Sequence, residues 1–452
     1  MAEFKLKRGF NIPLAGTAEK VLQDTAVPDT VAILPQEFRG VKPRLLVKEG
    51  DPVKIGSPLF TDKQNPEICF VAPVSGKVTA INRGERRKLM EIVVENDKNE
   101  QAEKLEGWSA DAVDKMDREA LTKALLSGGM WPYIIQRPFS VIASPSETPR
   151  DIFISGFDTS PLAAKVGFLV KEKMEAFQSG IQVLQKLTDG KVHLSVPKSD
   201  SVFDKVQGVE KHVFSGPHPA GNVGVQIHHI NPLKRGEMVW QVKPEAVALI
   251  GEFFKLGHFP NQRIVAVAGT SLKEQKYFKT TIGAPLISLI PEENIVDHEV
   301  RFIAGNVLAG RTSNYKSYVG MYDSLITVIP EGEKKRKLLG YSLPGFKTLS
   351  YSRTFFASLI PGKRTYEQDT LLKGGKRAFV MSSTDYQNVV PMDILPVQLA
   401  KSILSEDIVE MEGLGILELE EEDLALCSYI CLSKTDFGEL LRSGLDLIQK
   451  EG

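Results

Sequence analysis

Two of the chain's three cysteines, Cys427 and Cys431, lie four positions apart in the stretch DLALCSYICLSK. Two thiols at this spacing can form half of a metal or iron–sulfur site, because such sites use cysteine thiolates as ligands. They can equally be two small apolar residues of a core. The third cysteine, Cys69, lies far upstream, so the sequence predicts no disulfide framework and indicates a reducing compartment.

A ferredoxin template decides between these interpretations. Bacterial ferredoxin runs follow C-x2-C-x2-C-x3-C-P, and in two-cluster domains the fourth cysteine serves the other cluster. When the last two cysteine places fall on Cys427 and Cys431, the first two fall on Glu421 and Leu424. A second run that ends at Pro391 has at its four places Val380, Ser383, Tyr386 and Val390. Neither run supplies a full set of thiolates, so we predict a ferredoxin frame with vestigial cysteines and no metal.

Histidines crowd one region, at His212, His218, His228 and His229. We interpret KHVFSGPHPAGNVGVQIHHI (211–230) as strands, in which adjacent side chains point to opposite faces. His228 and His229 would then be unable to bind one metal ion together. Neither a carboxylate three or four positions on nor a nearby cysteine completes a ligand set, so we expect no zinc site here.

Two glycine-rich stretches interrupt the same region, SGGMWPYIIQRPF (127–139) and SGPHPAGNVG (215–224). Glycine is needed where the backbone passes close to a phosphate or a flat ligand. Neither stretch matches G-x-G-x-x-G after a strand or G-x-x-x-x-G-K-[ST]. Two interpretations stay open: tight turns of an α/β domain, or a degenerate nucleotide-site loop with Gly216, Gly221 and Gly224.

Lys63 is a candidate modification site. The order KEGDPVKIGSPLFTDK…APVSGKVTAI resembles a biotinyl/lipoyl-type barrel-sandwich domain, in which a lysine at a hairpin tip carries the swinging cofactor. Lys63 sits near that place and Glu67 follows it by four positions, but the spacing to Ala72 and Pro73 is longer than the lipoyl pattern. Lys63 is therefore either a lipoylated lysine or an exposed turn lysine on a barrel that serves as scaffold.

The rest of the sequence predicts the elements that position these residues. Strands and helices alternate from about residue 103 to 256, which indicates an α/β layer with largely parallel strands. Residues 261–290 resemble a β-grasp module of the soluble-ligand-binding (SLBB) type, and helical spacing dominates from Asp393 onward. The predicted fold class is multidomain α/β. Its ranges are a barrel-sandwich hybrid unit (1–100), a Rossmann-like α/β domain (101–257), an SLBB-like β-grasp domain (258–330), a β-rich connector (331–379) and a helical, ferredoxin-derived domain without clusters (380–452).

Composition restricts the partners. The net charge of −1, with 25% charged and 42% hydrophobic residues, gives no electrostatic reason to expect nucleic acid. VALIGEFF (247–254), among the longest apolar runs, falls far short of the roughly 20 residues that cross a bilayer. The N-terminal stretch MAEFKLKRGFNIPLAG does not read as a signal peptide. We expect a soluble protein, or one that is peripheral to a membrane.

Several stretches together carry a family resemblance: KLKRGFNIPLAG, APVSGKVTAINRGERRK, GMWPYIIQRPFS, HVFSGPHPAGNVG and EEDLALCSYIC. Over nearly its full length the chain resembles the NqrA family, which belongs to the sodium-translocating NADH:quinone reductase. That family is related to the C subunit of Rnf-type ferredoxin:NAD oxidoreductases and to the flavin/NADH subunit of respiratory complex I. Flavin-bearing relatives read GGAGFPT at the first glycine stretch, where Met130 and Trp131 would here crowd an isoalloxazine or nicotinamide ring. The resemblance implies a dehydrogenase scaffold that has lost NADH, flavin and cluster binding.

The resemblance also implies a function. The chain would be a peripheral accessory subunit, on the cytoplasmic side of the bacterial inner membrane, of a six-subunit enzyme that couples NADH-to-quinone electron transfer to sodium export. That complex uses NADH, FAD, FMN, riboflavin, Fe-S centres and ubiquinone, with menaquinone as an alternative quinone. This subunit would bind no cofactor itself and would not be catalytic in isolation. Its partners would be the other subunits, especially the integral membrane subunit that carries the quinone site.

Residues 131–139 are the candidate contact segment for a quinone or a partner. Trp131, Tyr133, Arg137 and Phe139 offer aromatic faces and a guanidinium, which can stack on a quinone ring or on a partner helix. They can equally be ordinary interface and core aromatics. Two functions of other classes stay open as alternatives: a stand-alone flavin/NADH-binding oxidoreductase, and a lipoylated carrier modified at Lys63.

Overall fold

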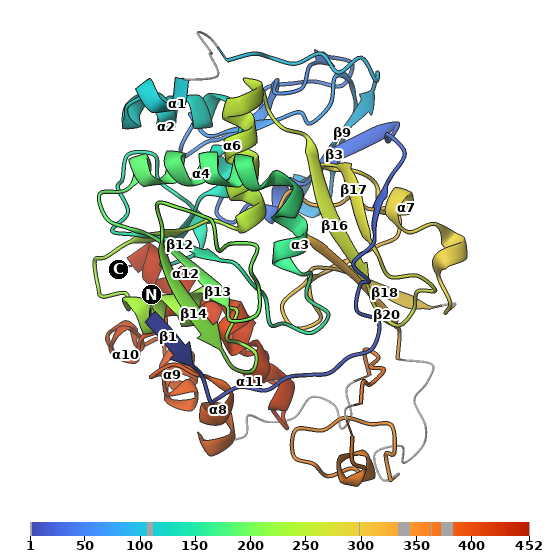
Figure 1. The fold of residues 1–452 in the computed structure, drawn as a ribbon, viewed down its shortest axis with the longest axis vertical. Helices are drawn as coiled ribbons and strands as arrows, with labels where there is room; N and C mark the ends of the chain where they lie inside the picture. Colours follow the sequence, from blue (N-terminus) through green and yellow to red (C-terminus); the bar gives the residue numbers. More distant parts are fainter. Residues whose placement is uncertain are drawn as a thin grey trace.

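The computed structural model describes residues 2–105, 112–297, 299–332, 344–362, 364–371 and 383–451. Its strands form four sheets, and helices pack against the largest of them (Figure 1). One hydrophobic core is continuous from the small N-terminal sheets through the largest sheet into the C-terminal helices, and a second fills the six-stranded sheet. The predicted multidomain α/β fold class is confirmed.

The largest sheet has seven strands and forms the centre of the molecule. Its strand order is β1 (Ala2–Lys5), β14 (Glu210–Ser215), β13 (Val192–Pro197), β12 (Ile152–Ser155), β15 (Val239–Gln241), β10 (Ile135–Arg137) and β11 (Val141–Ile142). The first five pair in parallel, whereas β10 and β11 add an antiparallel edge. Helical crossovers between parallel strands are the reason that this region alternates in sequence between strand and helix patterns.

Two of the crossover helices pack closely on each other above the sheet (Figure 1). The helices of this domain are α1 (Ala112–Lys115), α2 (Arg118–Ser127), α3 (Val166–Val170), α4 (Met174–Leu187), α5 (Val223–Ile230) and α6 (Pro244–Leu256). A side-chain carbon at Gly180 of α4 would meet the Val247 carbonyl oxygen at 2.0 Å, and one at Gly251 of α6 would meet that of Ala176 at 1.8 Å. Glycine at both places lets the two backbones approach.

Two small sheets form the barrel-sandwich unit. One contains β3 (Thr30–Ile33), β9 (Leu89–Asn96), β8 (Gly76–Arg83) and β5 (Pro52–Val53), and the other contains β4 (Pro43–Leu45), β6 (Pro58–Asp62) and β7 (Cys69–Val71). Phe60 and Phe70 stack with their ring centroids 4.3 Å apart, and Phe38 packs against Phe70 at 4.4 Å. These aromatic contacts close one end of the unit.

The six-stranded sheet forms the SLBB-like domain. Its order is β19 (Arg311–Ser313), β18 (Val300–Ala304), β20 (Leu325–Pro330), β16 (Gln262–Ala268), β17 (Tyr277–Thr281) and β2 (Leu22–Asp24). The predicted short helix after Pro285 is present as α7 (Leu286–Leu289).

The N-terminal segment joins three units before it enters the barrel. β1 adds to the seven-stranded sheet beside β14, and β2 adds to the six-stranded sheet beside β17. The range 1–100 predicted for the barrel unit therefore contains two strands of other sheets. Local sequence carries little information on this point, because an edge strand is defined by the partner it finds.

The C-terminal region is helical, as predicted. It contains α8 (Ser383–Val389), α9 (Pro396–Leu404), α10 (Ile408–Gly413), α11 (Ala425–Ile430) and α12 (Phe437–Glu451). The apolar face predicted for the last helix is buried at Leu441, Leu445 and Ile448. The predicted β-rich connector is not observed: its described residues form turns, one 3-10 helix (Phe356–Leu359) and a single bridge from Tyr366 to Leu14.

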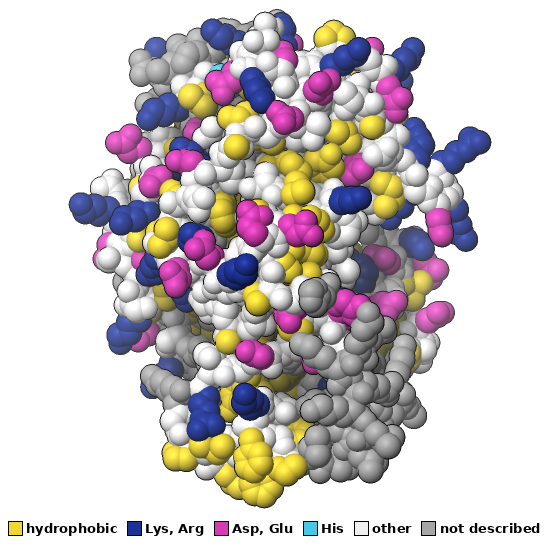
Figure 2. Space-filling model, turned by 90° about the vertical axis from the view of Figure 1, so that its right-hand side faces the viewer, with side chains coloured by type: hydrophobic (Ala, Val, Ile, Leu, Met, Phe, Trp, Pro, Cys, Tyr) yellow, Lys and Arg dark blue, Asp and Glu magenta, His cyan; other side chains and the backbone are white. Residues whose placement is uncertain are grey.

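The described part of the chain contains no helix with the length and apolar character needed to cross a bilayer. Figure 2 shows acidic and basic side chains mixed over one face, with hydrophobic side chains gathered at its lower end. Among the large hydrophobic side chains that are exposed, Phe346, Phe356 and Leu359 belong to one segment (344–362), and the two phenylalanine rings lie 5.5 Å apart.

Candidate functional site

The strand order of the seven-stranded sheet predicts where a ligand would bind. From β12 the chain continues outward to β13 and β14 on one side, whereas β15 pairs with the other side of β12. In open α/β sheets ligands bind outside the carboxyl ends of the strands where the order reverses in this way. The carboxyl ends of β12 and β15 carry Ser155 and Gln241.

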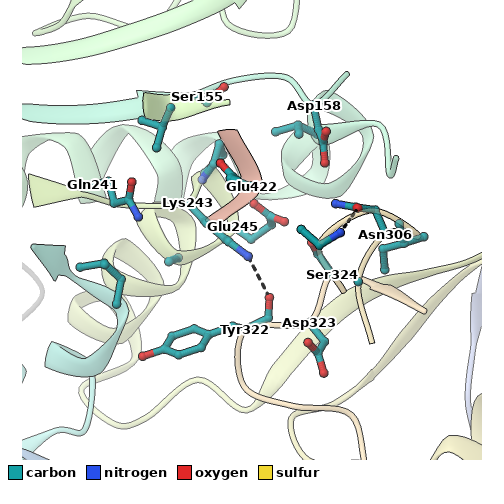
Figure 3. Close-up of a pocket in the computed structure, with 18 of the residues that line it drawn as sticks. Ser155, Asp158, Gln241, Lys243, Glu245, Asn306, Tyr322, Asp323, Ser324 and Glu422 are labelled. Carbon is teal, nitrogen blue, oxygen red and sulfur yellow. Dashed lines mark hydrogen bonds between the residues drawn. The ribbon is translucent and has the colours of Figure 1, made fainter. Parts of the chain in front are cut away.

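A cavity of about 710 Å³ lies at this switch point. Its wall combines the ends of β12 and β15, the start of α6, the loops at the ends of the six-stranded sheet, and the C-terminal 3-10 helix η10 (Glu421–Leu424). Figure 3 shows side chains from all of these elements around the space, namely Ser155, Asp158, Gln241, Lys243, Glu245, Asn306, Tyr322, Asp323, Ser324 and Glu422. The size is that of a small-molecule site.

The lysines and arginines that line the cavity are already bound to protein groups. The Lys243 ammonium donates to the Tyr322 carbonyl oxygen at 3.2 Å (Figure 3), and Arg311 pairs with Asp323 at 2.9 Å. The Arg263 guanidinium donates to two backbone carbonyl oxygens. Arg39 pairs with Glu421 and Lys173 with Glu252. Among the described residues, the cavity wall therefore offers no unpaired lysine or arginine to a phosphate.

Two lining residues have strongly perturbed protonation. Burial, reinforced by the nearby Asp323 carboxylate, raises the pKa of Glu37 to about 7, although its carboxylate accepts hydrogen bonds from the backbone of Met321 and Tyr322. Burial also raises the pKa of Tyr133 far above its usual value. The Tyr133 hydroxyl has no hydrogen-bond partner among the described residues. Tyr133 is therefore a neutral, unpartnered donor at the cavity wall.

A carboxylate from the C-terminal domain occupies the place where a nucleotide phosphate would bind. In dinucleotide-binding folds the phosphates lie at a helix N-terminus beside a glycine loop, because free N–H groups and the helix dipole attract anions. Here the loop before α5 ends at Asn222, whose amide donates to the Asp423 carboxylate at 3.1 Å. A side-chain carbon at Gly224 would meet the same carboxylate at 2.3 Å. Asp423 therefore takes the position of the anion.

The other glycines of this loop also face protein rather than open space. A side-chain carbon at Gly216 would meet the Leu6 carbonyl oxygen at 2.6 Å, and one at Gly221 would meet the Thr159 nitrogen at 2.6 Å. The first glycine stretch is filled in the same way, because Phe253 covers Gly128 and Val71 covers Gly129. Close chain packing thus explains glycine at all of these positions without a bound nucleotide.

The four residues of the candidate contact segment separate in the structure. Tyr133, in the 3-10 helix η3 (Trp131–Tyr133), borders the cavity. Trp131 is fully buried, donates to the Ala143 carbonyl oxygen at 2.8 Å and packs edge-on against Trp240. The Phe139 carbonyl oxygen accepts a hydrogen bond from Arg442. Of the four, only Tyr133 lines the cavity.

Arg137 connects the central sheet to the C-terminal domain. Its side chain is 0% exposed, and its terminal nitrogens lie 2.7 Å from the Glu420 carboxylate and 3.8 Å from that of Asp423. It also donates to the Glu418 carbonyl oxygen at 3.0 Å. A guanidinium held by these groups positions η10 over the cavity, and it is not oriented toward a ligand.

The vestigial cysteines are buried, and their surroundings follow the ferredoxin frame. Burial raises the pKa of Cys427 far above its usual value. Cys431, the fourth place of one run, is hydrogen-bonded to Tyr386, the third place of the other. These two places would share a cluster in a two-cluster ferredoxin. Val380 lies outside the described residues. No metal-ligand group of three among the described residues includes either cysteine.

The interpretation of residues 211–230 as strands is wrong beyond Ser215, because His228 and His229 lie on helix α5. A short apolar run cannot be assigned to helix or strand by periodicity alone. His228 bonds to Glu418 at 2.7 Å and accepts from the Asp393 backbone at 3.0 Å, and His229 lies 2.8 Å from the Pro391 carbonyl oxygen. These two side chains hold the C-terminal domain.

Lys63 lies where the sequence predicted, in the exposed turn between β6 and β7. Its backbone N–H donates to the Lys42 carbonyl oxygen at 2.9 Å. Whether Lys63 carries a lipoyl group stays a prediction.

Sequence reasoning missed most of the cavity wall. Glu37, Asp158, Lys243, Tyr322 and Asp323 come from four separate parts of the chain, and none belongs to a recognisable motif. A partial signal was present, since Asp158 and Lys243 each follow a predicted strand end or precede a helix. The other three depend on how the SLBB-like domain and the barrel unit pack on the central sheet.

Comparisons with known proteins match this architecture. Residues 4–97 match the family described as NqrA N-terminal barrel-sandwich hybrid domain, residues 116–259 the NqrA second alpha/beta domain, and residues 264–314 the NQRA C-terminal domain. The NqrA subunit of the Na(+)-translocating NADH-quinone reductase from Neisseria meningitidis serogroup A strain Z2491 is 39% identical over 450 residues, which cover 99% of this chain and 100% of the relative. The chain belongs to the NqrA family. It is thus related over nearly its full length to a named component of a complex enzyme.

Further relatives with the same name agree. The protein of Pasteurella multocida strain Pm70 is 37% identical over 449 residues, covering 99% of both chains. That of Yersinia pseudotuberculosis serotype O:1b is 39% identical over 450 residues, covering 99% of this chain and 100% of the relative. Among solved structures, an NAD+-reducing [NiFe]-hydrogenase in the H2-reduced state aligns with a TM-score of 0.39 at 10% identity, covering 76% of this chain and 64% of the hydrogenase chain.

Proposed function

We propose that this chain is a peripheral accessory subunit of the six-subunit Na+-translocating NADH:quinone reductase, located on the cytoplasmic side of the membrane. In this proposal it holds neither flavin nor an Fe-S cluster, and NADH oxidation takes place in other subunits. It docks beside the membrane subunit that carries the quinone site, and its switch-point cavity accepts the quinone headgroup.

One observation carries the proposal: the switch-point cavity is present, but its anion place is filled. The Asp423 carboxylate stands at the N-terminus of α5, and no lysine or arginine of the described cavity wall is free for a phosphate. NADH, FMN and FAD all carry phosphates, so each would meet a carboxylate where it needs an N–H donor. A ligand of this cavity is therefore expected to be uncharged.

A quinone headgroup fits the groups that remain. It is a flat, neutral ring with two carbonyl oxygens, each of which accepts a hydrogen bond. Apolar faces at Ile135, Phe157 and Leu249 line the cavity, and the Tyr133 hydroxyl is a buried donor without a partner among the described residues. A donation from Tyr133 to a ring carbonyl oxygen would remove the cost of leaving that donor unpaired.

The surface supports a role in an assembly. Phe346, Phe356 and Leu359 expose 59%, 51% and 74% of their surface, and they lie close in sequence. Exposed apolar groups of this kind favour contact with a partner protein. The absence of a membrane-crossing helix in the described residues is consistent with attachment through other subunits.

The experiment compares Tyr133→Phe with wild type in the complex purified from detergent-solubilised membranes. Phenylalanine keeps the ring and removes the donor, so kcat/KM for quinone should fall by about 2- to 13-fold, equivalent to one neutral hydrogen bond of roughly 0.5–1.5 kcal/mol. Reduction of the flavins by NADH should stay at the wild-type rate. The matched control is Tyr315→Phe, a half-buried tyrosine that does not line the cavity.

Two results would contradict parts of the proposal separately. Wild-type quinone kinetics in an assembled Tyr133→Phe complex would exclude the headgroup contact and leave the accessory role intact. Failure of the wild-type chain to co-purify with the membrane subunits would contradict its place in the complex.

A further inference from the structure

Three potential metal ligands lie together at the amino-terminal ends of β13 and β14. These strands are parallel, with His193 opposite Glu210 in the register. Residues opposite each other in neighbouring strands project to the same face, and so do residues two apart in one strand. Glu210 and His212 are two apart on β14. The pairing of the strands therefore places all three side chains on one face of the sheet.

The separations between the side-chain atoms match a small coordination sphere. His193 Nδ1 lies 3.0 Å from His212 Nε2 and 3.5 Å from Glu210 Oε2. One donor atom from each of the three residues lies within 4.8 Å of the others. A tetrahedral Zn²⁺ ion with ligand bonds of about 2.0–2.1 Å holds its donors about 3.3 Å apart. The two printed separations bracket that value.

A carboxylate behind His193 fixes its orientation. Asp151 Oδ1 lies 3.6 Å from His193 Nε2, the ring nitrogen that faces away from the other two ligands. Asp151 is itself held by the backbone N–H of Lys191 at 3.0 Å and by the Asn231 amide at 3.2 Å. Metal-binding histidines regularly place their second nitrogen against a carboxylate, which sets the tautomer and the ring orientation. Phe153 stacks on His193 with its ring centroid at 4.7 Å.

We propose that His193, Glu210 and His212 form a binding site for a divalent metal ion, with zinc as the best match to two imidazoles and one carboxylate. The site lies at the opposite ends of the strands from the cavity, and it does not depend on the proposed function. Glu210 binds through Oε2, since its other oxygen pairs with Lys191. Its side chain is 45% exposed, so the fourth position faces solvent and takes a water molecule.

The protonation of His212 suits this role. Burial and the neighbouring His193 lower the pKa of His212 to about 4, so this imidazole is neutral at pH 7 and can present a lone pair. A plain hydrogen bond between the two histidines would explain their 3.0 Å separation. It would not explain why the Glu210 and Asp151 carboxylates lie on either side of the same imidazole ring.

The test uses the full-length chain without a histidine tag, after treatment with EDTA. Calorimetry with zinc chloride should show one ion per chain, and cobalt chloride should give the visible absorption of a tetrahedral site. His193→Gln and His212→Gln should abolish both signals, while Asp151→Asn should weaken zinc binding roughly 10- to 100-fold. His258→Gln is the matched control, because His258 lies outside the cluster and faces the Phe259 carbonyl oxygen.

Anomalous diffraction from a zinc-soaked wild-type crystal locates the ion even if a variant does not fold. An anomalous peak between the three side chains would support the site. The absence of stoichiometric binding by the wild type would overturn the proposal. So would an unchanged cobalt spectrum in the His193→Gln, His212→Gln double variant, or a thiolate-to-cobalt charge-transfer band that places the ion on the cysteines.

Discussion

Replacing Arg137 by methionine should destabilise the chain by an amount that only a buried ion pair explains. Methionine keeps most of the side-chain length but removes the charge that faces Glu420 at 2.7 Å and Asp423 at 3.8 Å. The side chains of Arg137 and Asp423 are both 0% exposed, so Asp423 would keep an uncompensated buried carboxylate. Removing one partner of such a pair costs roughly 3–5 kcal/mol in free energy of unfolding.

The measurement is urea unfolding of the full-length chain, with Lys98→Met as the control. Lys98 pairs with Asp29 at 2.6 Å, but these side chains are 54% and 87% exposed. An exposed pair contributes only about 0.2–1 kcal/mol. In a double-mutant cycle, Asp423→Asn should recover part of the loss caused by Arg137→Met, because it removes the charge that was left unpaired.

The loss should also depend on pH in a defined direction. Burial raises the pKa of Asp423 to about 6 in the folded chain, and Arg137 opposes that rise. A carboxyl whose pKa is raised on folding keeps its proton where the unfolded chain, with a pKa of about 3.9, has lost it, so its contribution to stability falls as the pH rises through that window. Without Arg137 the pKa rises further, and the deficit should be larger at pH 7.5 than at pH 5. A loss below about 1 kcal/mol that does not change with pH would refute the ion-pair argument.

Further outcomes test the remaining structural arguments. Gly224→Ala should lower the free energy of unfolding by about 1–3 kcal/mol, because the new methyl group meets the Asp423 carboxylate at 2.3 Å. Gly413→Ala, which has no atom within 4 Å of the new carbon, should be neutral or stabilising by up to about 1 kcal/mol in the same unfolding assay. A Cys427→Ser, Cys431→Ser double variant should assemble into the complex normally. Anaerobic reconstitution of the wild type with iron and sulfide should give no stoichiometric cluster absorbance, and a full cluster spectrum would count against the vestigial frame. Calorimetry of the isolated chain with FMN or NADH should show no micromolar binding, whereas a clear isotherm would show that Asp423 does not block the anion place.

The sequence predicted those features that depend on local pattern. Alternating strand and helix signals indicated the α/β class, because a parallel sheet requires a crossover between successive strands. The spacing of Leu441, Leu445 and Ile448 predicted the buried face of the last helix. The ferredoxin template placed Tyr386 and Cys431 in corresponding positions, and the structure brings these two side chains together. In each case neighbours in sequence carry the information.

Only the tertiary structure decided which groups face the cavity and which face the protein. Arg137 reads from the sequence as a donor for a ligand, but it is neutralised by Glu420 and Asp423, about 280 residues further on. His193 carried no signal, because its partners Glu210 and His212 are reached only when β13 and β14 pair in parallel. Similarly, Asp423 and the N-terminus of α5 meet only when the C-terminal helices pack on the central sheet. Electrostatic contacts between distant segments leave no periodic trace in the chain, since their energy depends on distance in space and on burial and not on separation in sequence.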